Sequence, residues 1–319
     1  MDSIKQISNE FIEENTNFIE LISEIKTHFF NNEVIVPMRH HHDFPNPTVK
    51  SDSTLLVMPA WNPSKNAGVK IVTISPENRQ FNLPSIQGTY IYFDSINGSI
   101  KAILEAKSLT AKRTAATSAL ASSFLSRKNA SSLLIIGTGA LSKNLILAHA
   151  SVRPIKNIFV WGRSFDKAAA ICNELEHENF KINPIATIEE KISTVDIISC
   201  ATLSKTPLVL GKHIKPGQHI DLVGAYKKDM READDEAIIK ASVFVDTFQG
   251  GLKESGDIVI PLQKGILKKK DIKADLFQLC SNQKKGRNSK KEITFFKSVG
   301  HALEDLAAAN YFYTTFINE

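Results

Sequence analysis

The stretch Ser132-Leu133-Leu134-Ile135-Ile136-Gly137-Thr138-Gly139-Ala140-Leu141-Ser142 decides the fold of this chain. Residues 132–136 form a nearly continuous apolar run, which is typical of a strand covered on both faces. A helical pattern follows at 141–150, and a second apolar strand pattern at 157–161. A buried strand, a glycine turn, a helix and another strand predict the first unit of a parallel sheet.

The glycine turn has the features of a phosphate-binding loop. Glycine at 137 and 139 lets the backbone approach a pyrophosphate, whose charge the N-terminus of the next helix stabilises. Ser142 takes the place of the third glycine of the usual fingerprint and is still small. We predict that a dinucleotide binds at Gly137, Thr138, Gly139, Ala140 and Leu141; the alternative is a glycine turn without a ligand.

The end of the second strand indicates which dinucleotide binds. An acidic residue there would hold the ribose hydroxyls of NAD, whereas arginine would pair with a 2′-phosphate. The chain has Arg163 and Ser164, with Lys167 one turn later, and no carboxylate before Asp166. Because arginine forks onto phosphate oxygens, we expect NADP(H) to be preferred over NAD(H). An exposed loop role for Arg163 and dual specificity remain open alternatives.

The rest of the chain shows two different patterns of predicted helices and strands. Apolar residues recur at helical spacing over residues 7–30, with a break near 15–16. The strand-like runs that follow are separated by turns and predict an antiparallel sheet. We therefore expect the first third of the chain to be an α+β unit. A helix at 109–125 then leads into alternating strands and helices, which predict a doubly wound parallel sheet, and a last helix over 299–316. The expected strands are 34–36, 54–58, 68–72, 88–93, 100–103, 196–200, 219–223 and 242–246, and further helices are expected at 166–178 and 233–241.

Composition narrows the function classes. Hydrophobic content of 42% and charged content of 23% are ordinary for a globular enzyme. Residues 1–5 do not resemble a signal peptide, no apolar run approaches the roughly 18 residues of a membrane span, and three scattered cysteines suit a reducing cytoplasm. We expect a cytoplasmic protein with no membrane partner.

The net charge of +5 is local. Residues 264–292 hold ten basic and three acidic residues, so the remainder, with 29 basic and 31 acidic residues, is slightly acidic. No recognition module accompanies this lysine-rich segment, and we expect a solvated surface rather than a nucleic-acid site.

Three cations in the first third are candidates for binding an anion: Arg39, Lys70 and Arg113. Lys70 interrupts an otherwise apolar strand, where a lysine either reaches an edge or meets an anionic partner. Arg113 lies in an alanine-rich helix whose small neighbours allow close approach. A surface location for each is the alternative.

At this point the chain resembles the ornithine cyclodeaminase/μ-crystallin superfamily over nearly its whole length. The resemblance rests on residues 56–60, 68–70, 109–120 (with Arg-Thr-Ala-Ala-x-Ser-Ala-Leu), 137–139 and the Phe-Lys-Ser-Val-Gly of 296–300. It implies an α/β fold in which a Rossmann-type, doubly wound parallel sheet (residues 116–295) is inserted in an α+β substrate-binding and dimerisation domain (1–115, completed by the helix of 296–319). It also implies a homodimer.

The resemblance also assigns roles. Arg39, Lys70 and Arg113 would clamp a substrate carboxylate beside the nicotinamide, with Met58 and His301 in the substrate pocket. Thr114 and Tyr226 would lie near the cofactor. His301 could instead cap the last helix.

Two departures from the cyclodeaminase pattern favour another branch. Cyclodeaminases carry an aspartate at the position of Tyr226 and a glutamate at the position of Leu56. Without these two carboxylates, the loss of ammonia is hard to explain. The segments 228–234 and 254–257 look like the imine-reductase branch, which reduces 1-pyrroline-2-carboxylate and 1-piperideine-2-carboxylate to L-proline and L-pipecolate.

The reduction needs positioning and a proton. The clamp and the nicotinamide would hold the imine carbon for hydride transfer, and Lys70, or a water it holds, would protonate the imine; alternatively Lys70 supplies only charge and solvent supplies the proton. Ornithine cyclodeaminase, an alanine-type amino-acid dehydrogenase and a non-catalytic μ-crystallin-like binding protein are the alternative functions.

No metal site is expected. His40, His41 and His42 are adjacent, and consecutive side chains of a strand point to opposite faces, so on a strand the three cannot converge on one ion. A loop would suit a metal better and is the alternative, but Pro45 and Pro47 follow.

Overall fold

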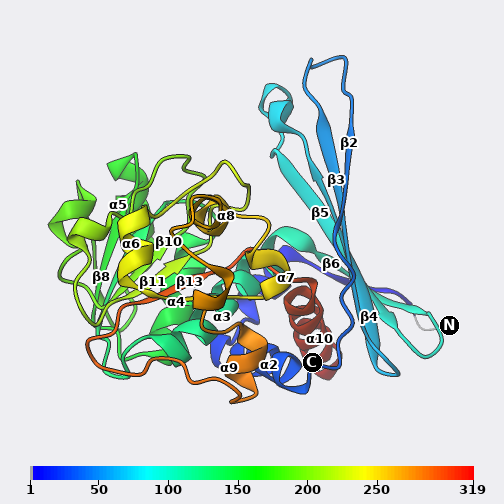
Figure 1. Ribbon diagram of the computed structural model, residues 1–319. Coiled ribbons are helices and arrows are strands. Elements are labelled where there is room, and N and C mark those ends of the chain that lie inside the picture. The colour runs from blue at the N-terminus through cyan, green and yellow to red at the C-terminus, as the bar shows by residue number, and fades with distance from the viewer. Residues whose placement is uncertain (1–2) are drawn as a thin grey trace. The chain divides into compact units, whose positions relative to one another are not determined.

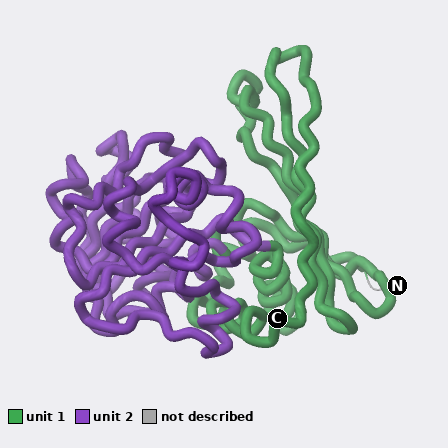
Figure 2. Tube along the Cα trace, viewed as in Figure 1, with its two compact units in different colours: residues 1–113, 302–319 green, residues 114–301 purple. Residues whose placement is uncertain are grey.

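The computed structural model describes residues 3–319, which form two compact units (Figure 2). Unit 1 comprises the chain up to residue 113 together with 302–319, and unit 2 comprises residues 114–301. The boundaries expected from the sequence were 115/116 and 295/296. Met1 and Asp2, which begin the segment used to argue against a signal peptide, lie outside the described residues.

Unit 1 contains a six-stranded sheet in the order β1-β6-β5-β4-β3-β2. The antiparallel meander predicted from the sequence is confirmed for β3 to β6, and β1 adds to β6 in parallel. The strand expected at 34–36 is wrong: Ile35 forms only an isolated bridge with Trp61, and Pro37, which follows, has no N–H to extend a ladder. The strands are β1 (Lys5–Ile7), β2 (His40–Phe44), β3 (Ser53–Asn62), β4 (Asn66–Ile74), β5 (Ile86–Asp94) and β6 (Ile100–Glu105).

Helices cover one face of this sheet. The expected break near 15–16 is confirmed, since α1 (Asn9–Glu14) ends there and α2 (Phe18–Asn31) begins after the N-cap Asn17. The final helix α10 (Ala302–Asn318) packs on α2 and on β3, β4 and β5 (Figure 1). Strand residues facing it alternate with partly exposed ones, so unit 1 has one core, and the acidic start of α10 is buried in it.

Unit 2 contains a seven-stranded sheet in the order β12-β13-β11-β10-β7-β8-β9, with every pairing parallel. The predicted doubly wound parallel sheet is therefore confirmed. Its apolar core includes Leu134, Ile198, Leu222 and Phe295, all inaccessible to solvent. The strands are β7 (Ser132–Ile136), β8 (Asn157–Trp161), β9 (Lys181–Pro184), β10 (Ile197–Cys200), β11 (His219–Leu222), β12 (Ser242–Val245) and β13 (Thr294–Lys297).

The sequence patterns did not predict several short elements. Strand β13 ends in a lysine that is fully buried, and this hid its place in the unit 2 sheet and shifted the expected boundary. The helix α3 (Ala106–Leu125) is continuous across 113/114, so no break in the sequence marks that boundary. The other helices are α4 (Ser142–Val152), α5 (Phe165–Glu174), α6 (Asp235–Lys240), α7 (Phe248–Gly251), α8 (Gly256–Gln263) and α9 (Leu276–Cys280), with 3₁₀ turns at Pro76–Phe81, Ile188–Glu190, Gly211–His213 and Lys269–Asp271.

The strand order of unit 2 locates the edge where sheets of this kind bind ligands. From β7 the chain winds through β8 and β9 on one side, then returns to β10 and β11 on the other. In such sheets the crevice lies outside the carboxyl ends of the strands at this switch point, here β7 and β10. None of the helices in residues 3–319 is long and apolar enough to cross a membrane.

Candidate active site

The glycine turn after β7 is built by close backbone approach. Gly137 has a φ of +127°, and a Cβ on it would lie 2.6 Å from the carbonyl oxygen of Ala201. A Cβ on Gly162 would lie 2.5 Å from Cγ2 of Thr138. The carboxyl ends of β7, β8 and β10 therefore meet only because these two residues have no side chain.

The same turn leaves room for an anion. A Cβ on Gly139 would meet nothing within 4 Å, and Gly139 and Ala140 are exposed. Leu141 is the N-cap of α4 and supplies no side-chain hydrogen bond to the helix N-terminus. Ser142, fully buried, donates its hydroxyl to the Gly137 carbonyl at 2.9 Å, so it fastens the turn to the helix. An open backbone surface before a helix without a side-chain cap fits a pyrophosphate.

The end of β8 presents cations at this edge. Arg163 and Lys167 are exposed, and Ser164 caps α5 by accepting a hydrogen bond from the Lys167 N–H at 3.4 Å. The cap fixes the turn that carries Arg163 next to Gly162. Two cations at the end of the second strand suit a phosphate on the ribose.

Two further residues expected near the cofactor, Thr114 and Tyr226, lie in unit 2, and so does His301, which was expected in the substrate pocket. Thr114 is buried at the start of the unit, in α3. Tyr226 follows β11, at the same edge of the sheet as the glycine turn, and the Lys227 ammonium lies 5.7 Å from its ring centre. His301, immediately before α10, makes an edge contact with the ring of Phe277, 6.1 Å between centres.

In unit 1, three of the sheet's residues form a row beneath α10. Met58, Lys70 and Tyr90 face one another across β3, β4 and β5, and each is at most 4% exposed. Tyr90 fits because Gly68 is a glycine: a Cβ there would lie 2.2 Å from the Tyr90 hydroxyl. In the register of the sheet, Lys70 therefore lies between a methionine and a tyrosine.

The start of α10 supplies two carboxylates that the sequence reasoning missed. Asp305 accepts a hydrogen bond from the Lys70 ammonium at 2.8 Å and forms an ion pair with Arg113, whose Nε lies 2.9 Å from the carboxylate. Glu304 accepts from a terminal nitrogen of Arg113 at 2.6 Å. Both acids have no exposed surface. The signal that could have revealed them is the one that drew attention to Lys70: charged residues within an otherwise apolar element.

The cluster shifts the ionisation of its members. Burial, together with the positive charges of Arg113 and Arg39, lowers the pKa of Lys70 from 10.5 to about 8, although Asp305 opposes the shift. Burial disfavours the Asp305 carboxylate, but Lys70 and Arg113 outweigh it and lower the pKa of Asp305. Asp305 therefore stays ionised, while Lys70 becomes a far stronger acid than an ordinary lysine.

Arg39 interacts with this cluster through its charge. Its side chain is half-buried, and its charge acts on both Lys70 and Asp305. The structure thus brings together the three cations singled out in the sequence.

Two further sequence observations have a place in unit 1. Leu56 lies two residues before Met58 on β3, opposite His41 of β2 and Val72 of β4. His40, His41 and His42 are exposed along β2, in the alternating arrangement of a strand.

Comparison with known proteins identifies the family. A model of the ornithine cyclodeaminase/mu-crystallin family matches residues 4–319. The Delta(1)-pyrroline-2-carboxylate reductase of Colwellia psychrerythraea is 35% identical over 310 residues, which are 96% of this chain and 98% of the relative. The chain belongs to the ornithine cyclodeaminase/mu-crystallin family, as the sequence motifs indicated.

Solved structures agree with the fold. The Delta(1)-pyrroline-2-carboxylate reductase of Thermococcus litoralis, in complex with NADH and L-proline, matches with a TM-score of 0.91 and 31% identity, covering 99% of this chain and 98% of that one. An archaeal alanine dehydrogenase dimer with bound NAD matches with a TM-score of 0.90 and 25% identity, covering 99% and 96%.

Proposed function

We propose that this member of the ornithine cyclodeaminase/mu-crystallin family is an NAD(P)H-dependent reductase of cyclic imino acids. Its substrates would be 1-pyrroline-2-carboxylate and 1-piperideine-2-carboxylate, and its products L-proline and L-pipecolate. The similarity to reductases of this kind supports the reaction. The observation in this chain that carries the proposal is the buried cluster of Lys70, Arg113 and Asp305.

The charge of the cluster suits a substrate carboxylate. Arg39, Lys70 and Arg113 carry three positive charges, whereas Glu304 and Asp305 carry two negative ones. The surplus of one positive charge in a buried setting favours binding one anionic group. In this role Arg39 and Arg113 hold the carboxylate, and Met58 packs against the ring carbons.

Lys70 is the proposed proton donor. A pKa of about 8 leaves it protonated at neutral pH yet able to release its proton, which is what a general acid requires. Asp305 holds the ammonium in place through a 2.8 Å hydrogen bond. The alternative, in which solvent protonates the imine and Lys70 supplies only charge, predicts that removing the lysine affects substrate binding more than turnover.

The glycine turn of unit 2 is the proposed dinucleotide site. When bound, the reduced nicotinamide supplies the hydride that the imine carbon accepts. Gly137, Thr138, Gly139, Ala140 and Leu141 hold the pyrophosphate at the N-terminus of α4, and Thr114 and Tyr226 complete the proposed cofactor contacts. His301 is proposed to border the substrate.

We also propose a preference for NADPH over NADH. Arg163, Ser164 and Lys167 stand at the end of β8, where a 2′-phosphate would be recognised, and the first acidic residue, Asp166, comes later, within α5. NADH remains a substrate, because the pyrophosphate contacts are common to both dinucleotides.

The proposed assembly is a homodimer. The sheet face turned away from α10 carries partly exposed apolar side chains that neighbour one another in register: Val57, Trp61, Val69, Ile71, Ile91 and Phe93. Strands β2 to β5 extend past the helices of unit 1 (Figure 1), and Phe44, Phe81 and Ile86 are about half exposed on them and on the loop between β4 and β5. Apolar surface of this kind marks an association site. A cytoplasmic location is also proposed and is supported by three free, buried cysteines.

One specific observation favours a second candidate, an alanine-type dehydrogenase: the match to an archaeal alanine dehydrogenase at a TM-score of 0.90. That enzyme would oxidise the reduced dinucleotide with pyruvate plus ammonium. The proposed reductase would act on a preformed ring imine.

The test measures the oxidation of NADPH or NADH with three substrates and the formation of proline from a fourth. The purified protein receives NADPH or NADH with 1-pyrroline-2-carboxylate, 1-piperideine-2-carboxylate, or pyruvate plus ammonium, and L-ornithine is offered with NAD. Oxidation with a cyclic imine, and no proline from ornithine, is the expected result. Turnover only with pyruvate and ammonium would replace the proposal with the second candidate, and silence with both imines would refute it.

The assignment of the clamp has its own test. Arg113→Lys keeps the charge that balances Glu304 and Asp305 but loses the fork geometry, so KM for the imino acid should rise about tenfold. An unchanged KM would remove Arg113 from the carboxylate site.

A further inference from the structure

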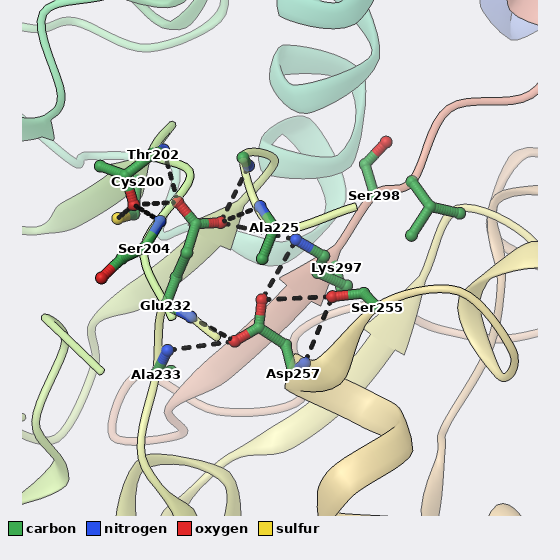
Figure 3. Close-up of polar contacts among 12 residues, drawn as sticks. Cys200, Thr202, Ser204, Ala225, Glu232, Ala233, Ser255, Asp257, Lys297 and Ser298 are labelled. Carbon is green, nitrogen blue, oxygen red and sulfur yellow. Dashed lines mark hydrogen bonds and ion pairs between the residues drawn. The ribbon is translucent and has the colours of Figure 1, made fainter. Parts of the chain in front are cut away.

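A second buried ionic cluster lies in unit 2 (Figure 3). The Lys297 ammonium, at the end of β13, is 3.2 Å from Asp257 and 3.5 Å from Glu232, and none of the three side chains has exposed surface. Burying three charged groups is costly unless each is paired and hydrogen-bonded. Because none of the three side chains reaches solvent, we look for their effect in the backbone groups that they bind.

Glu232 binds the loops that follow two neighbouring strands. One carboxylate oxygen accepts from the N–H of Thr202 at 2.7 Å and from its hydroxyl at 3.0 Å. The other accepts from the N–H groups of Gly224 at 2.8 Å and Ala225 at 3.0 Å. Thr202 follows β10 and Gly224 follows β11, so one carboxylate fastens both loops.

The two loops are in direct contact. A Cβ on Gly224 would lie 2.1 Å from both the nitrogen and the carbonyl oxygen of Thr202. Such close approach needs an anion that gathers the converging N–H groups, and Glu232 is that anion.

Asp257 and Lys297 hold Glu232 in place. Asp257, at the start of α8, accepts from the N–H groups of Glu232 at 2.8 Å and Ala233 at 3.1 Å. Its other oxygen faces the Lys297 ammonium. The cluster thus connects α8, the 232–233 segment, β13 and the two loops (Figure 3).

The fastened loops border the glycine turn. Ala201, immediately before Thr202, has its carbonyl oxygen 2.6 Å from where a Cβ of Gly137 would lie. Its N–H donates to the carbonyl of Ile136 at 2.9 Å. A shift of the loop after β10 therefore changes the shape of the turn proposed to bind the dinucleotide.

We propose that Glu232, Asp257 and Lys297 are positioning residues that hold the loops after β10 and β11 in the conformation that binds the dinucleotide. This inference rests on the proposed function, since it assigns the loops to that cofactor site. It predicts that a change in the cluster weakens cofactor binding while the KM for the imino acid, whose carboxylate ligands Arg39, Lys70 and Arg113 are proposed in unit 1, stays the same.

The key variant is Glu232→Gln. The amide keeps the shape of the side chain but replaces one accepting oxygen with an NH₂ group, which then faces backbone N–H groups of one loop. The matched control is Asp196→Asn. Asp196 also accepts backbone N–H groups, from Ser131 at 2.7 Å and Ser132 at 3.1 Å, but at the amino ends of β7 and β10, the opposite edge of the same sheet.

The experiment measures the Kd of NADPH and NADH by fluorescence titration, the KM of each substrate, and the Tm of each variant. Glu232→Gln should weaken cofactor binding about tenfold or more and raise the cofactor KM, with the imino-acid KM within about twofold of wild type. Asp196→Asn should lower Tm without moving the cofactor Kd. Both variants are titrated well below their Tm.

The outcomes separate the two proposals. Wild-type protein that binds neither NADPH nor NADH would overturn both the proposed function and this inference. Wild-type binding with an unchanged Kd in Glu232→Gln would overturn the inference alone. If Glu232→Gln does not fold, Thr202→Val, which removes one donor to Glu232, takes its place; it should weaken the cofactor Kd about threefold, and an unchanged Kd would overturn the inference.

Discussion

Lys70 and Lys297 are both buried in ionic clusters, but their pKa values shift in opposite directions. Burial, with a smaller contribution from the charges of Arg113 and Arg39, lowers the pKa of Lys70 to about 8, because its one carboxylate neighbour, Asp305, does not offset the loss of solvent. Burial acts on Lys297 in the same direction, but Asp257 and Glu232 overcome it and raise the pKa of that lysine. The count of neighbouring carboxylates, rather than burial itself, decides whether a buried lysine can give up its proton.

The two clusters therefore suit different work. The unit 1 cluster has a surplus of positive charge and a lysine whose pKa is lowered to about 8, as expected where an anionic substrate is bound and protonated. The unit 2 cluster has two carboxylates around one ammonium and fastens backbone N–H groups, as expected of a fixed scaffold.

The largest expected effect is on catalysis in unit 1. Lys70→Met removes the proposed general acid and one charge of the carboxylate site, so kcat/KM for 1-pyrroline-2-carboxylate should fall about 10³-fold. Steady-state kinetics measure it. Lys101→Met, on β6 of the same sheet, removes a partly exposed lysine 3.7 Å from Asp94 and serves as the control, with kcat/KM within about twofold of wild type. Comparable losses in both variants would show that the effect is not specific to the cluster.

The next effect is on stability in unit 2. Lys297→Met leaves Glu232 and Asp257 buried without their cation and should lower the free energy of unfolding by about 3 kcal/mol or more. Lys70→Met should cost less, since Asp305 keeps its contact with Arg113. Urea denaturation of the two variants measures the difference, and equal losses would break the comparison between the clusters.

A third effect distinguishes the lysines by pH. The pKa of Lys70 in the folded protein lies below its ordinary value of 10.5. Between pH 8 and 10.5 the unfolded chain therefore binds more protons at this residue than the folded protein does. As a result, Lys70 makes the wild-type free energy of unfolding rise with pH over this range. The gain should reach about 2 kcal/mol and vanish in Lys70→Met. The contribution of Lys297, whose pKa is raised, is fully present below 10.5 and is lost only above it. Denaturation from pH 7 to 10 checks this, and parallel curves for wild type and Lys70→Met would contradict it.

The smallest effect is on cofactor choice. Arg163→Ala should reduce the preference for NADPH over NADH about threefold to tenfold, because an exposed guanidinium loses part of its interaction with phosphate to solvent. Lys156→Ala, at the other end of β8, should leave the ratio unchanged. The ratio of kcat/KM values for the two dinucleotides is the measurement, and an unchanged ratio in Arg163→Ala would remove the 2′-phosphate assignment.

Much of the fold follows from local patterns. The run before Gly137 could be recognised as a buried parallel strand because it is apolar throughout and ends in a glycine turn, and the helices of residues 9–31 because their apolar residues recur at helical spacing. Short elements such as β13 and α8 could not, because four to eight residues carry too little periodicity and their charged residues read as surface.

The site was only partly visible for the same reason. Lys70 stood out as a charge within an apolar strand, but its partner Asp305 lies 235 residues away, and no local pattern pairs them. Asp257 lies in the segment 254–257, which the sequence showed only as a family resemblance, and it is fully buried against Lys297. Pairing of charges across the fold is a property of tertiary structure, so the sequence shows the candidates but not their partners.

The measurement that tests the account most directly is the dependence of kcat/KM on pH for 1-pyrroline-2-carboxylate, with wild type and Lys70→Met compared. Because kcat/KM reports groups of the free enzyme, the wild-type value should fall as pH rises through about 8, where Lys70 loses its proton, and this descending limb should be absent from the variant. The substrate's own titration appears in both profiles and cancels in their ratio. The same limb in both proteins would contradict the assignment of Lys70 as the proton donor.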